Sequence, residues 1–419
     1  MIKTKIYPNG LKLVVDEMPH FESVAFNMFV NTGSTNETPG IFGISHFIEH
    51  MLFKGTKSRT SFEISKAFDQ IGANVNAYTN FEETVFYTKS SSENAEKCVE
   101  IMSDMFFNST FDKKEMEREK NVVIEEIKMY DDDPASKAAS ILNKHFYAGT
   151  PFERDIAGTI SSVQNLTQKK MFDYKNKYYV AQNLTLSFAG KIDFETAQAL
   201  VEKYFLPNFN FEGIKSINNF KKTTGKFFAK AFKDNSQSVV LISFPGMKLE
   251  DKDINLARIF NIAFGGGMSS ILFQSIREKL GLVYSISSSI FANCAGGDIT
   301  IEFATSTKNV GVALEAVKNV LNDILQNGVP KEQFEDARNN LISSIKLSFE
   351  NTSAVCQYNA KKFAKLGKIV TKEEYIQSVQ NAKYQDLAKF LKTHFTRDNF
   401  AVSVVGKDKN IDIKKHFCF

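Results

Sequence analysis

Three residues near the N-terminus have the types and the spacing of a metal site. His46 and His50 are four residues apart, and Glu49 directly precedes the second histidine, in the pattern H-x-x-E-H. Positions four apart on a helix differ by about 40° around the axis, so both imidazoles would point the same way and could bind one metal ion. Glu49 would lie on nearly the same side, within reach of a water molecule at the metal. The order is the inverse of the zinc motif H-E-x-x-H and indicates metal-assisted hydrolysis.

The simpler alternative is a histidine pair on a surface helix or in a core. The side chains around the motif are large and apolar: Phe42, Phe47, Ile48, Leu52 and Phe53. A helix of this composition is largely buried, and burying two histidines and a carboxylate without partners is costly. The pattern therefore favours a metal site.

A third ligand is expected on the charged segment 116–130, which has the pattern of a helix. The neighbours three and four positions from Glu126 are largely apolar, whereas those of Glu125 are mixed: Val122, Val123, Met129 and Tyr130 against Asn121, Val122, Lys128 and Met129. A carboxylate on the more apolar side needs a cation or a hydrogen-bond partner, so we expect Glu126 to be the ligand. Glu119, seven residues earlier, would support the site with a hydrogen bond or would be a solvated helix charge.

Length and composition exclude several classes of protein. The 419 residues exceed one ordinary core and predict two or more domains. The net charge of +4 is mild and no dense Lys/Arg stripe is present, so we expect no nucleic-acid partner. The four cysteines are scattered without a C-x-x-C pair and are expected to be reduced thiols. No signal-like segment and no apolar run near 18 residues is present, so we expect a cytoplasmic protein with no membrane span.

Three pairs of short segments repeat at almost one offset. Two pairs match at 215 and one at 216: 23–29 with 238–244, 88–94 with 303–309, and 183–191 with 399–407. A constant offset predicts two similarly folded halves. We expect an N-terminal half at 1–212, a linker at 213–225 and a C-terminal half at 226–419.

Within each half, strand patterns alternate with helix patterns. Strands are expected at 12–15, 24–30, 84–88 and 184–188, and helices at 61–71 and 94–107. Short links between them favour an α+β fold, in which helices pack on a mainly antiparallel sheet. Adding 215 to His46, Glu49 and His50 gives Asn261, Phe264 and Gly265, so the second half is expected to keep the helix without the metal ligands.

The motif, the halves and the spacing resemble the pitrilysin and mitochondrial-processing-peptidase family of zinc peptidases, the inverzincins, over essentially the whole chain. His46-Phe-Ile-Glu-His50 matches the ligand and base motif of that family. The family's third ligand follows the second histidine by 76 or 77 residues, and Glu126 follows His50 by 76. Glu119 matches its supporting glutamate. The resemblance implies two αβ-roll halves that form a clamshell, with one zinc per chain.

The resemblance also implies further site residues. The segment Asn76, Ala77, Tyr78 and Thr79 matches a strand beside the family's active site and is expected to bind substrate as an added β-strand. Arg277 and Tyr284, seven apart, match residues that reach the active site from the second half. Without the resemblance they would be part of an ordinary helix that runs into a turn and a strand. Ile271 is a departure, because relatives commonly carry arginine there.

The predicted function is that of a zinc endopeptidase that hydrolyses unfolded peptides in a two-half chamber, with Glu49, Arg277 and Tyr284 as catalytic residues. Small bacterial members of the family often form homodimers, so a second copy is an expected partner. One alternative is a non-catalytic or processing-complex subunit that retains the fold, which would be expected to lose some of the metal-site residues. Another is a different metal hydrolase, such as an amidase. The sequence does not specify the physiological substrate or the metal loaded in cells.

Overall fold

The computed structural model describes residues 1–209 and 225–419, which form two compact units. Within these residues, unit 1 comprises 1–127, 155–209 and 347–370, and unit 2 comprises 128–154, 225–346 and 371–419. The predicted linker, 213–225, lies outside the described residues except for Gly225. The boundaries at 212 and 226 refer to the sequence repeat and stay a prediction.

Unit 1 is built on a six-stranded sheet. In spatial order its strands are β1 (Ile2–Ile6), β2 (Lys12–Glu17), β6 (Leu184–Gly190), β3 (Ser23–Val30), β5 (Thr84–Ser91) and β4 (Asn74–Thr79). All neighbouring strands are antiparallel except β2 and β6, which are parallel. β4 pairs only with β5 within the described chain and therefore forms one edge of the sheet.

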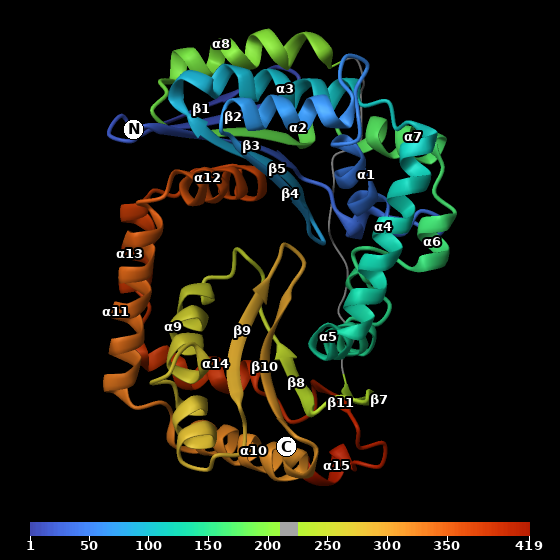
Figure 1. Cartoon of the computed structure of the whole chain (residues 1–419). Helices are drawn as coiled ribbons and strands as arrows, with labels where there is room; N and C mark the ends of the chain where they lie inside the picture. The colour runs from blue at the N-terminus through green and yellow to red at the C-terminus, as the bar shows by residue number, and fades with distance from the viewer. Residues whose placement is uncertain (210–224) are drawn as a thin grey trace. The chain divides into compact units, whose positions relative to one another are not determined.

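Helices cover both faces of this sheet (Figure 1). One face is covered by α2 (Ser61–Gln70), α3 (Ala95–Asn108) and α8 (Phe194–Tyr204), and the other by α12 (Thr352–Leu366). Unit 1 also contains α1 (Ile44–Leu52), α6 (Ile160–Gln164), α7 (Gln168–Tyr178) and most of α4 (Lys113–Asp132). Strand residues such as Phe26, Phe86 and Phe188 are at most 1% exposed and form the centre of the core.

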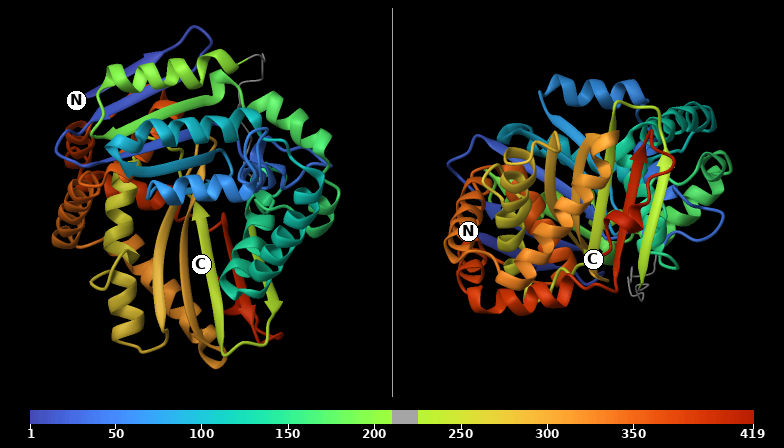
Figure 2. Two further views of the ribbon diagram at one scale, coloured as in Figure 1. Left: turned by 45° about the horizontal axis from the view of Figure 1, so that its top comes forward. Right: turned by 90° about the horizontal axis from the view of Figure 1, so that it is seen from below.

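Unit 2 contains a five-stranded sheet, whose strands lie side by side in both views of Figure 2. Their order is β7 (Lys226–Phe232), β11 (Phe400–Gly406), β8 (Gln237–Pro245), β10 (Gly297–Ser306) and β9 (Ser285–Ala292), with only β7 and β11 parallel. Its helices are α5 (Pro134–Phe146), α9 (Ile254–Gly265), α10 (Val310–Asn327), α11 (Lys331–Ser348), α13 (Lys372–Gln380), α14 (Leu387–His394) and α15 (Ile413–His416). The expected α+β class, with two mainly antiparallel sheets and packed helices, is confirmed.

Each sheet is covered on one face by a helix from the other half of the sequence. α5 precedes the linker in sequence but packs on β11, β8 and β7 of unit 2. α12 follows the linker but packs on β6, β3 and β2 of unit 1, where Val355 and Cys356 contact Ala25 and Ala189. The two sequence halves are therefore interleaved in the fold.

Among the described residues, none of the helices combines the length and the apolar character needed to cross a lipid bilayer.

Candidate metal centre

Helix α1 carries the H-x-x-E-H motif, and two features fix where it begins. Gly43 has φ +86°, and a Cβ atom there would lie 2.4 Å from the carbonyl oxygen of Ala157, so only glycine fits. Glu37 is 6% exposed and accepts hydrogen bonds from the backbone nitrogens of Gly43 at 2.7 Å and Ser45 at 2.9 Å. A carboxylate at a helix N-terminus satisfies N–H groups that lack partners within the helix.

The apolar residues of α1 face the core and leave the motif on the opposite side. Five of them are at most 1% exposed: Ile44, Phe47, Ile48, Met51 and Leu52. The side chains of His46 and His50 are 13% and 21% exposed, and their ring centres are 4.6 Å apart. The helical periodicity therefore brings the two imidazoles together at a partly accessible surface, as the sequence predicts.

His50 contacts two carboxylates of α4 through its two ring nitrogens. Nδ1 lies 2.8 Å from Oε1 of Glu119, and Nε2 lies 3.6 Å from Oε2 of Glu126. The same Glu126 oxygen lies 3.7 Å from Nε2 of His46. A hydrogen bond from Nδ1 to Glu119 orients the ring and leaves the Nε2 lone pair free for a metal.

One premise behind the choice of Glu126 is wrong. Val123 is buried, but Val122, Met129 and Tyr130 are 52%, 58% and 47% exposed, so the expected apolar stripe is not a buried one. Glu126 meets the histidines because it lies two helical turns after Glu119, on the side of α4 that faces α1. The residues near Glu126 in sequence are a poor guide to the direction in which its side chain points, because exposed apolar residues are common on protein surfaces.

The geometry of these atoms fits a zinc ion. One ring nitrogen each of His46 and His50 and a carboxylate oxygen of Glu126 lie within 4.8 Å of one another. Two of the separations are 3.6 and 3.7 Å. In a tetrahedral site with bonds of about 2.05 Å, ligand atoms are about 3.4 Å apart. Two imidazoles and one carboxylate with an open fourth position form a common ligand set of catalytic zinc.

The electrostatics favour the protonation states that a metal requires. Burial and the neighbouring His50 lower the pKa of His46 to about 3, so this imidazole is neutral. Burial opposes the charge of His50, but the hydrogen bond and the charge of Glu119 outweigh it and raise the pKa of His50. A metal ion would therefore compete with a proton mainly at His50.

Glu49 is held by the last residue of the edge strand. Thr79 Oγ1 donates a hydrogen bond of 2.6 Å to Oε2 of Glu49. Burial raises the pKa of Glu49, and this effect outweighs the Thr79 bond and the charge of His50. A carboxylate with a raised pKa beside a metal site is suited to accept and donate protons. Thr79 belongs to the expected substrate strand, and its contact with Glu49 was not predicted from the sequence.

Lys54 also belongs to the site, although it was not predicted from the sequence. Its Nζ lies 2.7 Å from Oε2 of Glu119, whose other oxygen contacts His50. Burial opposes the charge of Glu119, but the hydrogen bonds from His50 and Lys54 outweigh it and lower the pKa of Glu119. Lys54 follows His50 by four residues, and this spacing was a signal that it shares the face of the motif.

The expected substrate strand has one free edge. Asn76, Ala77, Tyr78 and Thr79 lie in β4, which pairs with β5 on one side only within the described chain. Tyr78 packs with Phe29, Val85 and α12, whereas Ala77 packs against the core on the other face. β4 is thus an edge to which a further strand could be added, although the backbone nitrogen of Ala77 already donates a 2.8 Å hydrogen bond to Oδ1 of Asn76.

Arg277 and Tyr284 lie together in unit 2. Nε of Arg277 donates to the backbone oxygen of Tyr284 at 3.0 Å, and its guanidinium lies 4.5 Å from the ring centre of Phe273. Arg277 is part of a π-helical segment (Phe273–Glu278), a local widening of a helix that is frequent at functional sites. The Tyr284 side chain is 75% exposed. Its hydroxyl forms no hydrogen bond with the described residues. Their role in a reaction stays a prediction.

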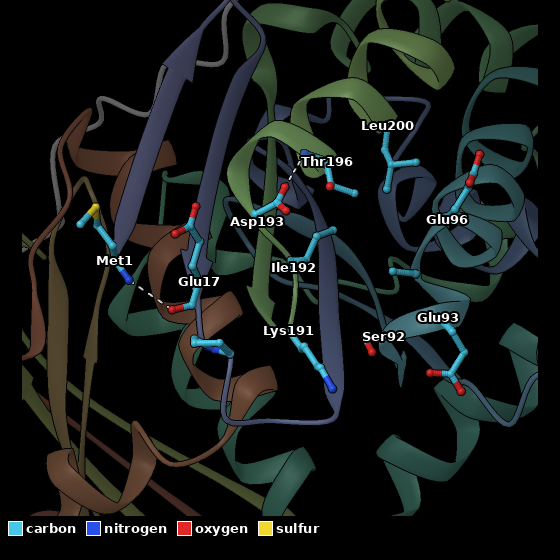
Figure 3. Close-up of a pocket in the computed structure, with 12 residues that line it drawn as sticks. Met1, Glu17, Ser92, Glu93, Glu96, Lys191, Ile192, Asp193, Thr196 and Leu200 are labelled. Carbon is cyan, nitrogen blue, oxygen red and sulfur yellow. Dashed lines mark hydrogen bonds between the residues drawn. The ribbon is translucent and has the colours of Figure 1, made fainter.

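A pocket of about 620 Å³ on unit 1 contains none of the predicted site residues (Figure 3). Its carboxylates already have structural roles. Asp193 accepts a hydrogen bond from the nitrogen of Thr196 at the start of α8, and Glu17 pairs with Lys3 at 2.9 Å. We assign no chemistry to this pocket.

Comparison with known proteins identifies the family. Residues 12–160 match the model described as Insulinase (Peptidase family M16), and residues 165–341 match the model described as Peptidase M16 inactive domain. A protein of Bacillus subtilis (strain 168) named uncharacterized zinc protease YmxG is 33% identical over 98% of this chain and 100% of its own length. One from Rickettsia bellii, also named uncharacterized zinc protease, is 34% identical over 90% of this chain and 91% of its own length. The chain belongs to peptidase family M16.

Solved structures share the whole fold at lower identity. A protease from Helicobacter pylori has a TM-score of 0.91 and 21% identity over 97% of this chain and 99% of its own. A peptidase M16 inactive domain from Pseudomonas fluorescens has a TM-score of 0.91 and 19% identity over 97% of this chain and 98% of its own. The family membership that the sequence motifs predicted is therefore confirmed.

Proposed function

We propose that the chain is a zinc-dependent endopeptidase that hydrolyses unfolded peptides or small flexible polypeptides. The observation that carries the proposal is the convergence of His46, His50 and Glu126 within 4.8 Å, in a family whose relatives are named zinc proteases. These three residues would hold one zinc per chain. Glu119 and Lys54 would keep His50 oriented toward it.

Zinc, when bound here, would polarise a carbonyl group and increase the acidity of a nearby water molecule. Glu49 would take the proton from that water and later give it to the leaving amine, because its side chain lies next to the ligands and keeps a raised pKa. Thr79 would hold one oxygen of Glu49 in place and leave the other free to exchange the proton.

The substrate would bind as an additional strand along β4. Main-chain hydrogen bonds to the outer edge of Asn76–Thr79 would hold an extended peptide with little demand on its sequence. The bond to be cleaved would then be fixed relative to Glu49, since Thr79 belongs to the same strand. Folded proteins would be poor substrates because their strands are already paired.

Arg277 and Tyr284 would donate hydrogen bonds to the substrate carbonyl as negative charge develops on its oxygen. This role rests on the sequence resemblance and on the exposure of the Tyr284 side chain. We expect Arg277→Ala and Tyr284→Phe to lower kcat/KM about 100-fold with unchanged zinc content and thermal stability. Lys279→Ala is the matched control, because Lys279 is a neighbouring exposed cation. Equal activity of all three variants would remove the pair from the reaction.

The direct test is cleavage of a library of unstructured peptides, read by mass spectrometry of the products. The zinc-loaded chain should cleave internal bonds, and treatment with a chelator should abolish cleavage until zinc is restored. Hydrolysis of small amides without peptide cleavage would support an amidase instead. Zinc binding without any cleavage would support the alternative of a non-catalytic partner subunit that retains the fold.

Strand addition has its own test, in which proline is placed at successive positions of a good substrate. Proline lacks the N–H group that a strand donates, so cleavage should fail at alternate positions near the scissile bond. Uniform tolerance of proline would contradict binding along β4. The homodimer, the two-half chamber and the cytoplasmic location stay predictions from the sequence.

A further inference from the structure

A second cavity of unit 1 contains a buried lysine without a described acidic partner. The cavity has a volume of about 660 Å³ and is formed by the end of α3, by α7 and by the segment around Asn208. Lys175 of α7 lines it and is 8% exposed. None of the metal-site residues lines this cavity, so it is separate from the proposed zinc site.

The charges around Lys175 do not balance within the described chain. Lys57 lines the same cavity, and no Asp or Glu of residues 1–209 and 225–419 is among the lining residues. The described ion pairs include neither lysine. Burial, together with the smaller effect of the charge of Lys57, lowers the pKa of Lys175 to about 8. In its charged form this buried lysine is unfavourable unless an anion accompanies it.

The walls of the cavity indicate which anion fits. Phe106, Phe172 and Phe209 supply aromatic surface, and Nζ of Lys175 lies 5.7 Å from the ring centre of Phe106. Asn108 and Asn176 supply neutral hydrogen-bonding groups. Cavities of this size with apolar walls and a few polar groups are typical of small-molecule sites. The apolar walls would contribute little to an inorganic ion and would favour an anion with an organic body.

We propose that this cavity binds a small amphipathic carboxylate, whose head contacts Lys57 and Lys175 and whose apolar body packs on the phenylalanines. The ligand would compensate a charge for which residues 1–209 and 225–419 supply no acidic lining residue. The site does not depend on the proposed peptidase function, since none of its residues takes part in metal binding.

The test is calorimetric titration of the full chain with 3-phenylpropionate, both as purified and after removal of the metal with a chelator. Saturable binding should persist without metal. The neutral amide 3-phenylpropionamide should bind at least tenfold more weakly, because it lacks the charge. Inorganic phosphate should also bind at least tenfold more weakly, because it lacks the apolar body. Absence of saturable binding by 3-phenylpropionate, or equal binding of the amide or of phosphate, would overturn the assignment.

Variants locate the binding to the cavity. Lys175→Met should weaken binding of 3-phenylpropionate at least tenfold and should keep or raise the melting temperature of the free protein, because an unpaired buried charge is removed. Lys177→Met is the matched control on the same helix, since Lys177 is exposed and does not line the cavity. Lys57→Met removes an exposed cation and should weaken binding several-fold even if Lys175→Met fails to fold. Wild-type affinity in Lys57→Met or in folded Lys175→Met would contradict the proposal.

Discussion

The two sheets of this protein have similar helices beside them, but only one helix retains room for chemistry. In unit 1, α1 presents His46, Glu49 and His50 away from the core, and Glu49 meets β4 through Thr79. In unit 2, α9 occupies the corresponding place in the repeat. Its three equivalent positions are Asn261, Phe264 and Gly265.

The difference is one of packing as well as residue type. Phe264 is fully buried, and Asn261 accepts a hydrogen bond of 2.8 Å from Ser288 of β9. A Cβ atom on Gly265 would lie 2.5 Å from the backbone nitrogen of Ser288. In α9, the face that corresponds to the metal-binding face of α1 therefore packs against the sheet of unit 2. Replacing single residues would not restore a metal site there, because the space for ligands is filled.

A second contrast concerns the helices that the two halves exchange. α12 is held on the first sheet by a buried ion pair, since Lys365 is 2% exposed and lies 3.1 Å from Glu83, which is 5% exposed. Both helices also accept a serine hydrogen bond from their sheet: Ser403 Oγ donates to the backbone oxygen of Ala138 in α5 at 2.8 Å, and Ser187 Oγ donates to that of Cys356 in α12 at 2.9 Å. The buried ion pair is thus an additional contact of α12 with the first sheet.

The largest effect is expected for Glu49→Gln. Without a group that accepts the proton of water, kcat should fall on the order of 10³-fold or more. Zinc content and thermal stability should not change, because Glu49 is not a ligand. Peptide cleavage by purified variant and wild type, together with metal analysis, checks this. Substantial turnover by the variant would exclude Glu49 as the base.

Next in size is the loss of the ion pair under α12. Lys365→Met leaves Glu83 buried without its main cation and should lower the free energy of unfolding by about 3–5 kcal/mol, as measured by urea denaturation. Lys361→Met is the control on the same helix, because Lys361 is 43% exposed and its pair with Glu83 should contribute less than about 1 kcal/mol. Equal losses in both variants would contradict this account of α12.

The same ion pair predicts a pH dependence. Burial opposes the charge of Glu83, but Lys365 and Lys361 outweigh it and hold the pKa of Glu83 below its ordinary value of 4.5. The unfolded chain therefore binds more protons, and the contribution of the pair is complete above pH 4.5 and is lost as the pH falls through the lowered pKa. Denaturation series between about pH 3 and 7 should show this loss in wild type and a smaller one in Lys365→Met.

A smaller effect is expected where the edge strand meets the base. Thr79→Val removes the hydroxyl that holds Glu49 and should lower kcat about 10- to 100-fold, with little change in KM or zinc content. Thr79→Ser keeps the hydroxyl and should restore most of the activity. An increase in KM alone, or no rescue by serine, would show that Thr79 acts through the strand and not through Glu49.

The smallest effect tests the closed face of the second helix. Gly265→Ala forces the Cβ atom against the Ser288 backbone and should lower the free energy of unfolding by about 1–3 kcal/mol. Gly267→Ala is the control, because a Cβ atom there meets nothing within 4 Å. If both variants are as stable as the wild type, α9 has room for a side chain and the comparison of the two helices fails.

The repeat was sufficient to predict the fold class, and the motif predicted the pairing of His46 with His50, since helical spacing sets which side chains share a face. The grouping of Glu126 with them rested on the family spacing, because its apolar neighbours are mostly exposed. The exchange of α5 and α12 was not predictable. A repeat shows that two segments fold alike, but not which sheet each helix covers. The contacts of Lys54 and Thr79 were also missed, because they join residues 65 and 30 positions apart in sequence.

The central claim is that unit 1 alone binds the metal, through His46, His50 and Glu126. The most direct measurement is the zinc content of purified wild type, Glu126→Gln and Glu125→Gln after dialysis against a weak chelator. Glu125 is the neighbouring exposed carboxylate on α4. The account predicts one zinc per chain in wild type and in Glu125→Gln, and a clear loss in Glu126→Gln. Loss of zinc from Glu125→Gln with retention in Glu126→Gln, or two zinc ions per wild-type chain, would contradict it.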